Sequence, residues 1–354
     1  MLRRATHAGS WYKADPAALD ADLTSFLDAV PAFSVEHGAL PIRGARIIIA
    51  PHAGYDYSGP TGAWAYKAWD VSNIKRVFVL GPSHHVYLRG CAISKCAAYE
   101  TPLGPLPLDG ATLDALEATG RFERMSRETD EDEHSLEMHL PFVRKILAAH
   151  YGPDRLPPLV PIMVGALTAA HEREYGQLLA PYLADKANAF VFSTDFCHWG
   201  QRFGYTAYVD DPEDFVAPRA LGRSSAPVSA AVPIYRSIEA LDYRGMDIAT
   251  DGSHALWTQY LADTGNTICG RHPLGVLLAA VELRRAAGQE LPDADRQPAE
   301  GTTPQAIVRE QGLTGEDALK YQFGKIYWVQ YKQSSRSVRL ADSSVSYASG
   351  FAKA

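Results

Sequence analysis

Four short apolar runs, rich in β-branched residues, limit the folds open to this 354-residue chain more than any other feature of its sequence. They are RIIIA (46–50), RVFVL (76–80), LVPIMVG (159–165) and AFVFST (189–194). A strand with one face in water alternates apolar and polar residues, whereas a strand covered on both faces is apolar throughout. Because helical stretches separate these runs, we expect an α/β fold with a central mixed sheet buried between helices.

Helical periodicity marks the segments that would cover such a sheet. One helix is expected to begin with Asp15 as its N-cap and Pro16 in its first turn, and to lay an apolar stripe over the sheet. A second helix is expected over residues 133–150, with its apolar side chains on one stripe. His134 and Glu137 fall off that stripe, so we expect them to face a cleft.

Charge and composition exclude several classes of partner. The formal net charge is −7 and the lysines and arginines are scattered, so the chain lacks the basic stripe that nucleic acids require. No apolar run approaches the roughly 20 residues of a membrane span. The four cysteines form no C-x-x-C pair, which argues against a disulfide framework or a zinc ribbon. We expect a cytoplasmic protein, with the nucleus as a second compartment left open.

Metal-competent side chains gather where strands end or helices begin. They occur in APHAGYDYSG (His52), GPSHHV (His84, His85), STDFCHWGQRF (Asp195, Cys197, His198) and NTICGRHPLG (Cys269, His272). In an open α/β sheet, loops at the strand ends converge on one crevice where ligands bind. A single histidine at a strand end is more often a hydrogen-bonded structural residue. Four such segments together favour a shared site.

The same motifs allow other interpretations, which their spacing makes weaker. Neighbouring residues of an extended segment point in opposite directions, so only one of His84 and His85 can easily enter a shared site. Cys197 beside His198 could be a nucleophile, but the same divergence argues against it. HSLEMH has neither zincin spacing, and GPSHH is not a nucleophile elbow.

Eight motifs together resemble the Memo family, which is named for mediating cell motility driven by receptor tyrosine kinases. They are THAGSWY, IIAPHAGYDYSG, LGPSHHV, FERMSRETDEDEHSLEMHLPF, STDFCHWGQRF, IYRSIEALD, NTICGRHPLGVLL and DSSVSYASG. The resemblance implies a single domain over residues 1–354. Two polar segments, at about 210–233 and 289–322, lie outside the resemblance and are expected to be surface insertions.

The resemblance also implies a fold similar to class III extradiol dioxygenases, which hold iron through two histidines and a glutamate. By this resemblance His52 and His84 match the two histidine ligands, and Cys269 takes the third place. His198 matches the acid/base, and His134 looks like a histidine that lines the site. With Asp195 of the STDFCHWG motif, His198 and His134 form the expected catalytic group, and the expected cofactor is an iron or copper ion, with zinc as an alternative.

A cysteine in the third ligand position separates this chain from the dioxygenases. A thiolate is soft and favours Cu(I), zinc or a more covalent iron site, which argues against ring cleavage. We expect a helix over residues 270–288, and its start, with Arg271 nearby, should favour the thiolate of Cys269.

Three functions remain open from the sequence. The first is a metal-binding protein with metal-dependent redox activity and a role in signalling, cell motility or cytoskeletal regulation. The second is a non-catalytic adaptor that binds phosphotyrosine peptides or signalling proteins on a vestigial dioxygenase fold. The third is a zinc-dependent hydrolase. Whether the chain is an enzyme, such as a metal-dependent oxidoreductase, is not decided by these residues.

Overall fold

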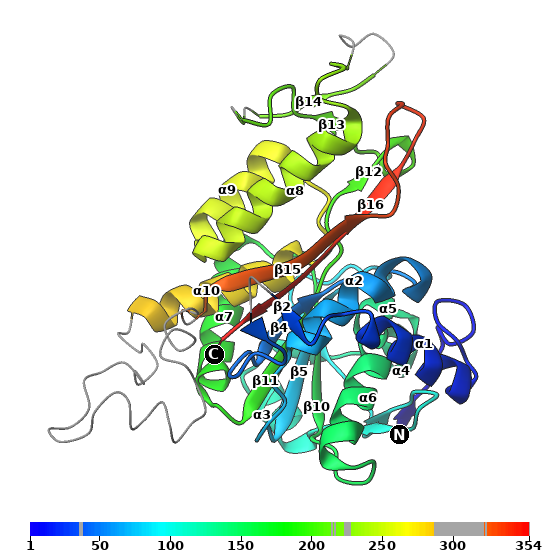
Figure 1. The fold of residues 1–354 in the computed structure, drawn as a ribbon. Coiled ribbons are helices and arrows are strands. Elements are labelled where there is room, and N and C mark those ends of the chain that lie inside the picture. Colours follow the sequence, from blue (N-terminus) through cyan, green and yellow to red (C-terminus); the bar gives the residue numbers. More distant parts are fainter. Residues whose placement is uncertain are drawn as a thin grey trace, which may run out of the picture.

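The computed structural model describes residues 1–34, 38–213, 215, 217–222, 228–286, 322 and 324–353. The described residues form an α/β fold around a nine-stranded mixed sheet with the order β12-β16-β4-β11-β5-β10-β6-β9, in which β15 also pairs with β16 (Figure 1). The strands are β4 (Ile47–Ala50), β5 (Arg76–Pro82), β6 (Cys91–Ile93), β9 (Phe122–Arg124), β10 (Leu159–Val164), β11 (Asn188–Ser193), β12 (His198–Trp199), β15 (Ile326–Gln333) and β16 (Ser344–Ala352).

The four apolar runs form the parallel centre of this sheet. β4, β11, β5 and β10 run parallel to one another, while β16 and β6 flank them in the antiparallel direction. Ile47 and Ile49 belong to one core layer, and Ile48 and Ala50 belong to the other, so both faces of the strand are covered. The expected sheet, buried between helices, is therefore confirmed.

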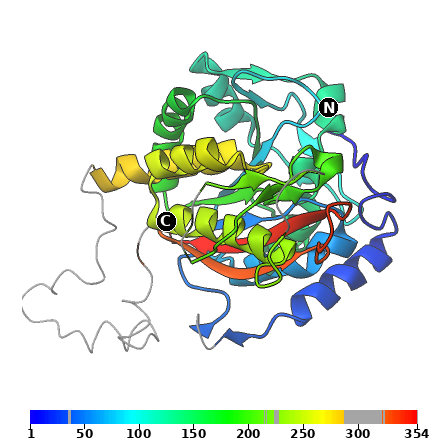
Figure 2. The same ribbon diagram turned by 90° about the horizontal axis from the view of Figure 1, so that it is seen from above.

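Helices cover the two faces of the sheet, as Figure 2 shows from above. On one face, α2 (Tyr55–Ala68) packs on β4 and β16, and both α1 (Pro16–Asp28) and α6 (Leu140–Tyr151) pack on α2. On the other face, α7 (Ala169–Ala184) and α10 (Arg271–Ala286) pack against each other and on β11. α3 (Gly110–Ala118) packs on β9 at the far edge.

The start of α1 is as expected. The Asp15 side chain accepts a hydrogen bond from the Ala18 N–H at 2.8 Å, and Pro16 is the first helical residue. The helix buries Leu19 and Leu23, but it packs chiefly on α2 rather than on the strands.

The single helix expected over residues 133–150 is wrong. The chain instead forms α5 (His134–Glu137) and α6 (Leu140–Tyr151), preceded by α4 (Arg127–Asp132). Pro141 stands in the first turn of α6, because proline has no N–H to continue a helix from the preceding turn. Glu137 is fully buried in a polar network and does not face a cleft.

A smaller layer stands beyond the end of the sheet near β12 (Figure 1). It contains α8 (Ile234–Asp251), α9 (His254–Thr264) and the strand pair β13 (Ala207–Tyr208) and β14 (Arg219–Ala220). Leu221 is buried there beside Trp199 and Ile238. The segment 210–233, expected as a surface insertion, thus contributes a strand and a core residue.

The remaining short elements lie around the main sheet. They are the three-stranded sheet of β1 (Leu2–Arg3), β7 (Ala98–Tyr99) and β8 (Leu106–Pro107), the pair β2 (Phe33–Ser34) and β3 (Gly38–Ala39), and a 3-10 turn (Gln201–Phe203). The expected insertion at 289–322 lies outside the described residues except for Gln322. Among the described residues, no helix combines the length and the apolar character needed to cross a membrane.

Candidate metal site

Three neighbouring parallel strands deliver side chains to one edge of the sheet. His52 stands two residues after β4, Asp195 two residues after β11, and His84 two residues after β5. β11 lies between β4 and β5, and parallel strands end at the same edge. The convergence predicted for these loops is therefore present in the structure.

His52, His84 and Cys269 form a triad, the name used below for these three residues. Their potential ligand atoms all lie within 4.8 Å of one another. The two imidazole centroids are 5.1 Å apart, and His52 is only 2% exposed. Three such donors at this spacing can surround one transition-metal ion.

Cys269 reaches the triad because its loop is tied to the end of β11. The Cys269 N–H donates to the Asp195 carbonyl at 3.2 Å, and the Gly270 N–H donates to Thr194 Oγ1 at 2.9 Å. A Cβ at Gly270 would collide with the Thr194 side chain and the Ser193 carbonyl. Glycine at this position therefore allows the close approach that brings Cys269 to the two histidines.

The hydrogen bonds of His52 fix its tautomer. Ser193 Oγ donates its single proton to the Ser135 carbonyl at 2.8 Å. The 2.7 Å contact between Ser193 Oγ and His52 Nδ1 therefore requires Nδ1–H to be the donor. Burial, reinforced by repulsion from His84, lowers the pKa of His52 well below its usual value. A neutral ring with a lone pair on Nε2 is the ligand form of histidine.

Glu133 orients His84 in a similar way. One carboxylate oxygen accepts from the His84 backbone N–H at 2.6 Å, and the other lies 2.8 Å from His84 Nδ1. Burial alone would raise the pKa of Glu133, but its hydrogen bonds and charge interactions with His84, helped by His134, lower it to about 2. The ionised carboxylate holds the proton on Nδ1, which leaves Nε2 as the free donor atom.

The ligand atoms of His84, Glu133 and His134 form a second group within 4.8 Å. Besides both contacts to His84, the Glu133 carboxylate accepts a hydrogen bond from the Ser135 N–H at 2.8 Å. The His84 and His134 rings are stacked at 4.3 Å, so their lone pairs do not converge well on a shared ion. Glu133 is therefore better described as the support of His84 than as a ligand.

His198 lies next to the cysteine of the triad. Its Nε2 is 3.7 Å from Cys269 Sγ, while its Nδ1 is 2.9 Å from the Phe196 carbonyl. A carbonyl accepts only, so Nδ1 carries the proton and Nε2 keeps a lone pair, while the sulfur lies nearly as close to Nδ1, at 3.9 Å. This position allows His198 to accept or donate a proton beside a group bound at the triad.

Asp195 and His134 flank the triad in different ways. The Asp195 carboxylate accepts a hydrogen bond from the His52 backbone N–H at 2.9 Å, and Asp195 is 3% exposed. Burial raises the pKa of Asp195, and the nearby His198 opposes this shift only in part. The side chain of His134 is 12% exposed, and burial, with repulsion from His84, lowers its pKa to about 3. Asp195 thus secures the His52 loop, whereas His134 and Trp11, with ring centroids 4.5 Å apart, stand beside the triad.

Two histidines that the motifs included do not join the triad. His85 is exposed, and its ring meets that of His134 edge-on at 5.9 Å. His272 Nδ1 lies 2.7 Å from a carboxylate oxygen of Glu172 on α7. Because α10 begins at Arg271, His272 belongs to the first helical turn and faces α7 instead of the strand ends.

The protonation state of the Cys269 thiol differs from what the sequence suggested. Burial, and secondarily the charge of Asp195, raises the pKa of the Cys269 thiol, and Arg271 opposes this only in part. Arg271 thus favours the thiolate, as expected, but burial outweighs its effect on the pKa in the chain alone, and a bound cation would favour the thiolate further. Cys197 is fully buried with a pKa well above its usual value, which argues against a nucleophile.

The sequence did not predict roles for Glu133, Ser193 and Asp242. Glu133 directly precedes His134 in DEDEHSLE, and Ser193 ends an apolar strand, so both stood inside recognised motifs. A histidine ligand normally needs a hydrogen-bond partner for its other ring nitrogen, and a search for such partners within the motifs would have suggested Glu133 and Ser193. Asp242 ends another recognised motif, IYRSIEALD, but it lies on α8 in the smaller layer and contacts none of the candidate ligands.

Asp242 binds the residues that directly precede His198 and Thr267, namely Cys197 and Asn266. One carboxylate oxygen accepts from the Cys197 N–H at 3.1 Å and from Asn266 Nδ2 at 3.2 Å, and the other accepts from the Tyr331 hydroxyl at 2.8 Å. Burial raises the pKa of Asp242 to about 6, although these hydrogen bonds oppose the shift.

The raised pKa gives a pH-dependence with a definite sign. Between about pH 4 and pH 6 the folded protein binds a proton at Asp242 that the unfolded chain has released, so stability from this group falls as pH rises. We expect Asp242→Asn to gain roughly 3 kcal/mol relative to the parent protein between pH 4 and pH 7. Urea unfolding of both proteins across this range measures the difference, and a constant difference would contradict the assignment.

The family model described as Memo-like protein matches residues 3–306. The chain is 43% identical to Protein MEMO1 of Danio rerio over 351 residues, which covers 99% of this chain and 97% of that protein. It is 41% identical to Protein MEMO1 of Homo sapiens over 350 residues, covering 99% and 97%. Protein memo-1 homolog of Caenorhabditis elegans is 38% identical over 348 residues, covering 98% and 81%.

Proposed function

The chain belongs to the Memo family, and from this premise we propose that it is a metal-binding protein that holds one iron or copper ion through His52, His84 and Cys269. The observation that carries the proposal is the spacing of their donor atoms, all within 4.8 Å of one another. We propose further that the ion gives the protein redox activity, which serves signalling or the regulation of cell motility and the cytoskeleton.

The hydrogen bonds around the triad are typical of a site that binds a cation rather than of a purely structural cluster of side chains. Nδ1 of both histidines is occupied by a partner, Ser193 for His52 and Glu133 for His84, so among the described residues each Nε2 is left as a donor atom. Histidines that bind metals are normally held in this way by an outer hydrogen bond.

The charge of Glu133 also supports a cation. Its carboxylate side chain is 1% exposed and ionised, and among the described residues its ion-pair partners are two histidines, His84 and His134. A buried carboxylate is costly without a compensating positive charge. A metal ion on His84 Nε2 would place that charge one imidazole ring away.

The donor set favours iron or copper over the hard cations. Imidazole and thiolate are borderline and soft ligands, which suit copper, iron and zinc and not magnesium or calcium. The fold is proposed to be related to class III extradiol dioxygenases, but a cysteine stands where those enzymes have a carboxylate. We therefore propose that a bound iron or copper ion would supply redox activity rather than ring cleavage, and that His198 would hold or move a proton beside Cys269 Sγ.

A phosphotyrosine-peptide adaptor is the second candidate. The exposed imidazole of His85 and the partly exposed rings of His134 and Trp11 stand next to the triad and could contact an anionic aromatic group. In that case phosphopeptide binding persists after chelation of the metal. Binding that disappears with the metal, and returns with it, would instead connect the peptide to the metal site.

The proposal is tested by isolating the protein under anaerobic conditions from its native cell and measuring the metal content. We expect about one iron or copper per chain, and a large decrease in the Cys269→Ala and His84→Ala variants. Equal metal content in the parent protein and both variants would contradict the proposal. Zinc as the native ion would favour the hydrolase alternative.

The close approach at Gly270 gives a further prediction. Gly270→Ala should push Cys269 away from the two histidines and weaken Co²⁺ binding at least about tenfold, because a site loosened by an ångström loses its fit. Titration of the variant with Co²⁺, alongside its thermal unfolding, measures both effects. Gly110→Ala is the control, since a Cβ there meets no atom within 4 Å. A folded Gly270→Ala protein with parental affinity would refute the argument.

A further inference from the structure

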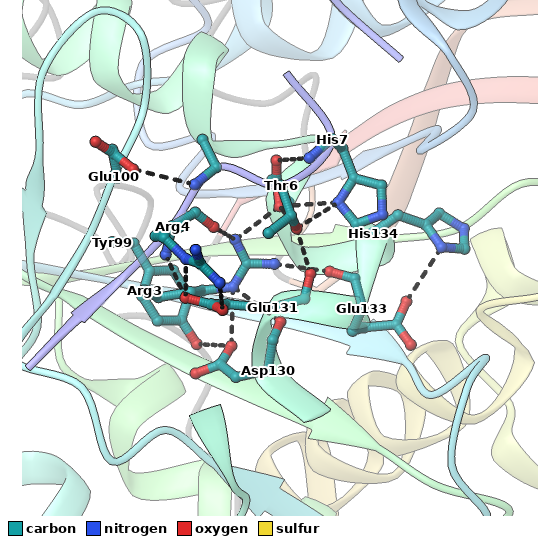
Figure 3. A network of polar contacts seen from close by, with 12 residues as sticks. Arg3, Arg4, Thr6, His7, Tyr99, Glu100, Asp130, Glu131, Glu133 and His134 are labelled. Atoms are coloured by element: carbon teal, nitrogen blue, oxygen red, sulfur yellow. Dashed lines mark hydrogen bonds and ion pairs between the residues drawn. The ribbon is translucent and has the colours of Figure 1, made fainter. Parts of the chain in front are cut away.

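The amino-terminal strand places an arginine in the interior. β1 pairs with β7, and this pairing buries Arg3 completely beside the segment that carries Glu133 (Figure 3). Its guanidinium donates to the Asp130 carboxylate at 3.0 Å and to the Glu137 carboxylate at 2.7 Å. It also donates to the backbone carbonyls of Asp130 and Glu133, each at 2.9 Å. We call Arg3, Asp130, Glu133 and Glu137 the Arg3 network.

Further partners complete the network. The Tyr99 hydroxyl donates to Asp130 at 2.6 Å, and the Tyr12 hydroxyl donates to Glu137 at 2.7 Å. His7 contacts Glu137 at 2.9 Å through both its backbone N–H and its Nδ1. A buried charge cluster is tolerated only when its members are paired and hydrogen-bonded in this manner. The network is thus a fixed structure and not a mobile surface ion pair.

The network lies where a helix is interrupted. α4 ends at Asp132 and α5 begins at His134, because Glu133 has an extended backbone with φ −82° and ψ 119°. In a continuous helix the Asp130 carbonyl would accept from the N–H of residue 134. The interruption removes that bond, and Arg3 supplies the carbonyl with a replacement donor.

This interruption is also what aims Glu133 at the metal site. The Glu133 side chain turns back toward the start of α5 and accepts from the Ser135 N–H, while it binds His84 at its backbone and at Nδ1. Arg3 holds the carbonyl of this same residue. A path of direct hydrogen bonds therefore runs from Arg3 through Glu133 to His84.

We infer that Arg3 is a positioning residue of the metal site, which acts through Glu133 to fix the ring and tautomer of His84. The inference rests on the proposed function. It makes the first residues of the chain part of the site, although Arg3 touches none of the triad. Outer hydrogen-bonding partners of metal ligands typically change metal affinity 10–100-fold when they are lost.

The test compares two buried arginines. Arg3→Lys keeps the charge but loses the planar fork that reaches several acceptors at once. Arg46→Lys is the matched control, because Arg46 is also buried, at 5% exposed, and also donates to a backbone carbonyl. Arg46 precedes β4, whereas His52 follows it, so Arg46 lies at the other end of that strand from the metal site. Co²⁺ titration should give an affinity about 10–100-fold weaker for Arg3→Lys and nearly unchanged for Arg46→Lys. Equal losses in both variants would overturn the inference.

A double-mutant cycle tests the path. In a Glu133→Gln background, Arg3→Lys should weaken Co²⁺ binding little further, because both changes act on the same hydrogen bond to His84. A full additional loss in that background would show that Arg3 acts elsewhere, and would overturn the inference. If Arg3→Lys does not fold, Asp130→Asn removes one carboxylate partner of the same arginine and should give a smaller loss in the same direction. Parental affinity in folded Asp130→Asn would then count against the network.

A measurement without metal separates this inference from the proposed function. Nitrogen chemical shifts of His84 in the metal-free protein report which ring nitrogen carries the proton. We expect the Nδ1–H tautomer in the parent protein and in Arg46→Lys, and a mixture of tautomers in Arg3→Lys. An unchanged tautomer in Arg3→Lys would overturn the inference. Failure of the parent protein to bind Co²⁺ would instead overturn the proposed function, while the tautomer result would still decide the role of Arg3.

Discussion

Replacing His84 with alanine is expected to reduce cobalt affinity by about 100-fold or more, because it removes one of three ligands. Structural zinc sites gain roughly 3 kcal/mol or more per ligand, and each 1.4 kcal/mol is a factor of ten. Cys269→Ala should cause a similar loss and should also abolish the sulfur-to-cobalt charge-transfer absorption. Co²⁺ titration followed by absorption spectroscopy measures both effects.

Neighbouring residues supply the controls for this experiment. His85→Ala removes an adjacent imidazole that is exposed and outside the triad, so its affinity should remain parental. Cys91→Ser changes a buried core cysteine, the first residue of β6, and tests whether any cysteine change has the same effect. If His85→Ala loses as much affinity as His84→Ala, the division of the histidine pair between ligand and neighbour is wrong.

Glu133→Gln is expected to weaken Co²⁺ binding 10–100-fold without removing a ligand. A glutamine amide cannot accept from both the backbone N–H and Nδ1–H of His84 through two oxygens, so the imidazole loses its fixed tautomer. Isothermal titration of the parent protein and the variant gives the ratio of affinities. Equal affinities would show that His84 needs no carboxylate support.

The same substitution has an effect on stability with a defined pH window. Since the pKa of Glu133 is lowered to about 2 in the folded protein, its ionised form stabilises the fold above about pH 4.5. This contribution is lost as the pH falls from about 4.5 to about 2. Glu133→Gln should therefore lack this part of the acid sensitivity, and parallel acid-unfolding curves for the two proteins would contradict it.

The sheet and the triad were accessible from the sequence for the same physical reason. Strands buried on both faces are apolar throughout, and the ends of parallel strands meet at one edge. The positions of His52 and His84 just after two such runs therefore already implied that they lie close together. Cys269 stands in a segment that opens a helix, and the resemblance to the Memo family gave it the place of the third ligand.

The supports of the triad could not be predicted in the same way. Glu133 faces His84 only because the helix is interrupted at that residue, and DEDEHSLE looks like a continuous helical stretch. Arg3 contacts Asp130 across 127 residues of chain, a separation over which neither periodicity nor capping rules apply. These contacts follow from tertiary packing, whereas the ligand positions follow from local strand structure.

The proposed function depends above all on an iron or copper ion held by His52, His84 and Cys269. X-ray absorption spectroscopy of protein isolated anaerobically from its native cell tests it most directly, because the spectrum identifies both the ion and the atoms bound to it. We predict an iron or copper edge at about one ion per chain, with imidazole nitrogen and one sulfur among the ligands. A bound ion without a sulfur ligand, or protein isolated without iron or copper, would contradict it.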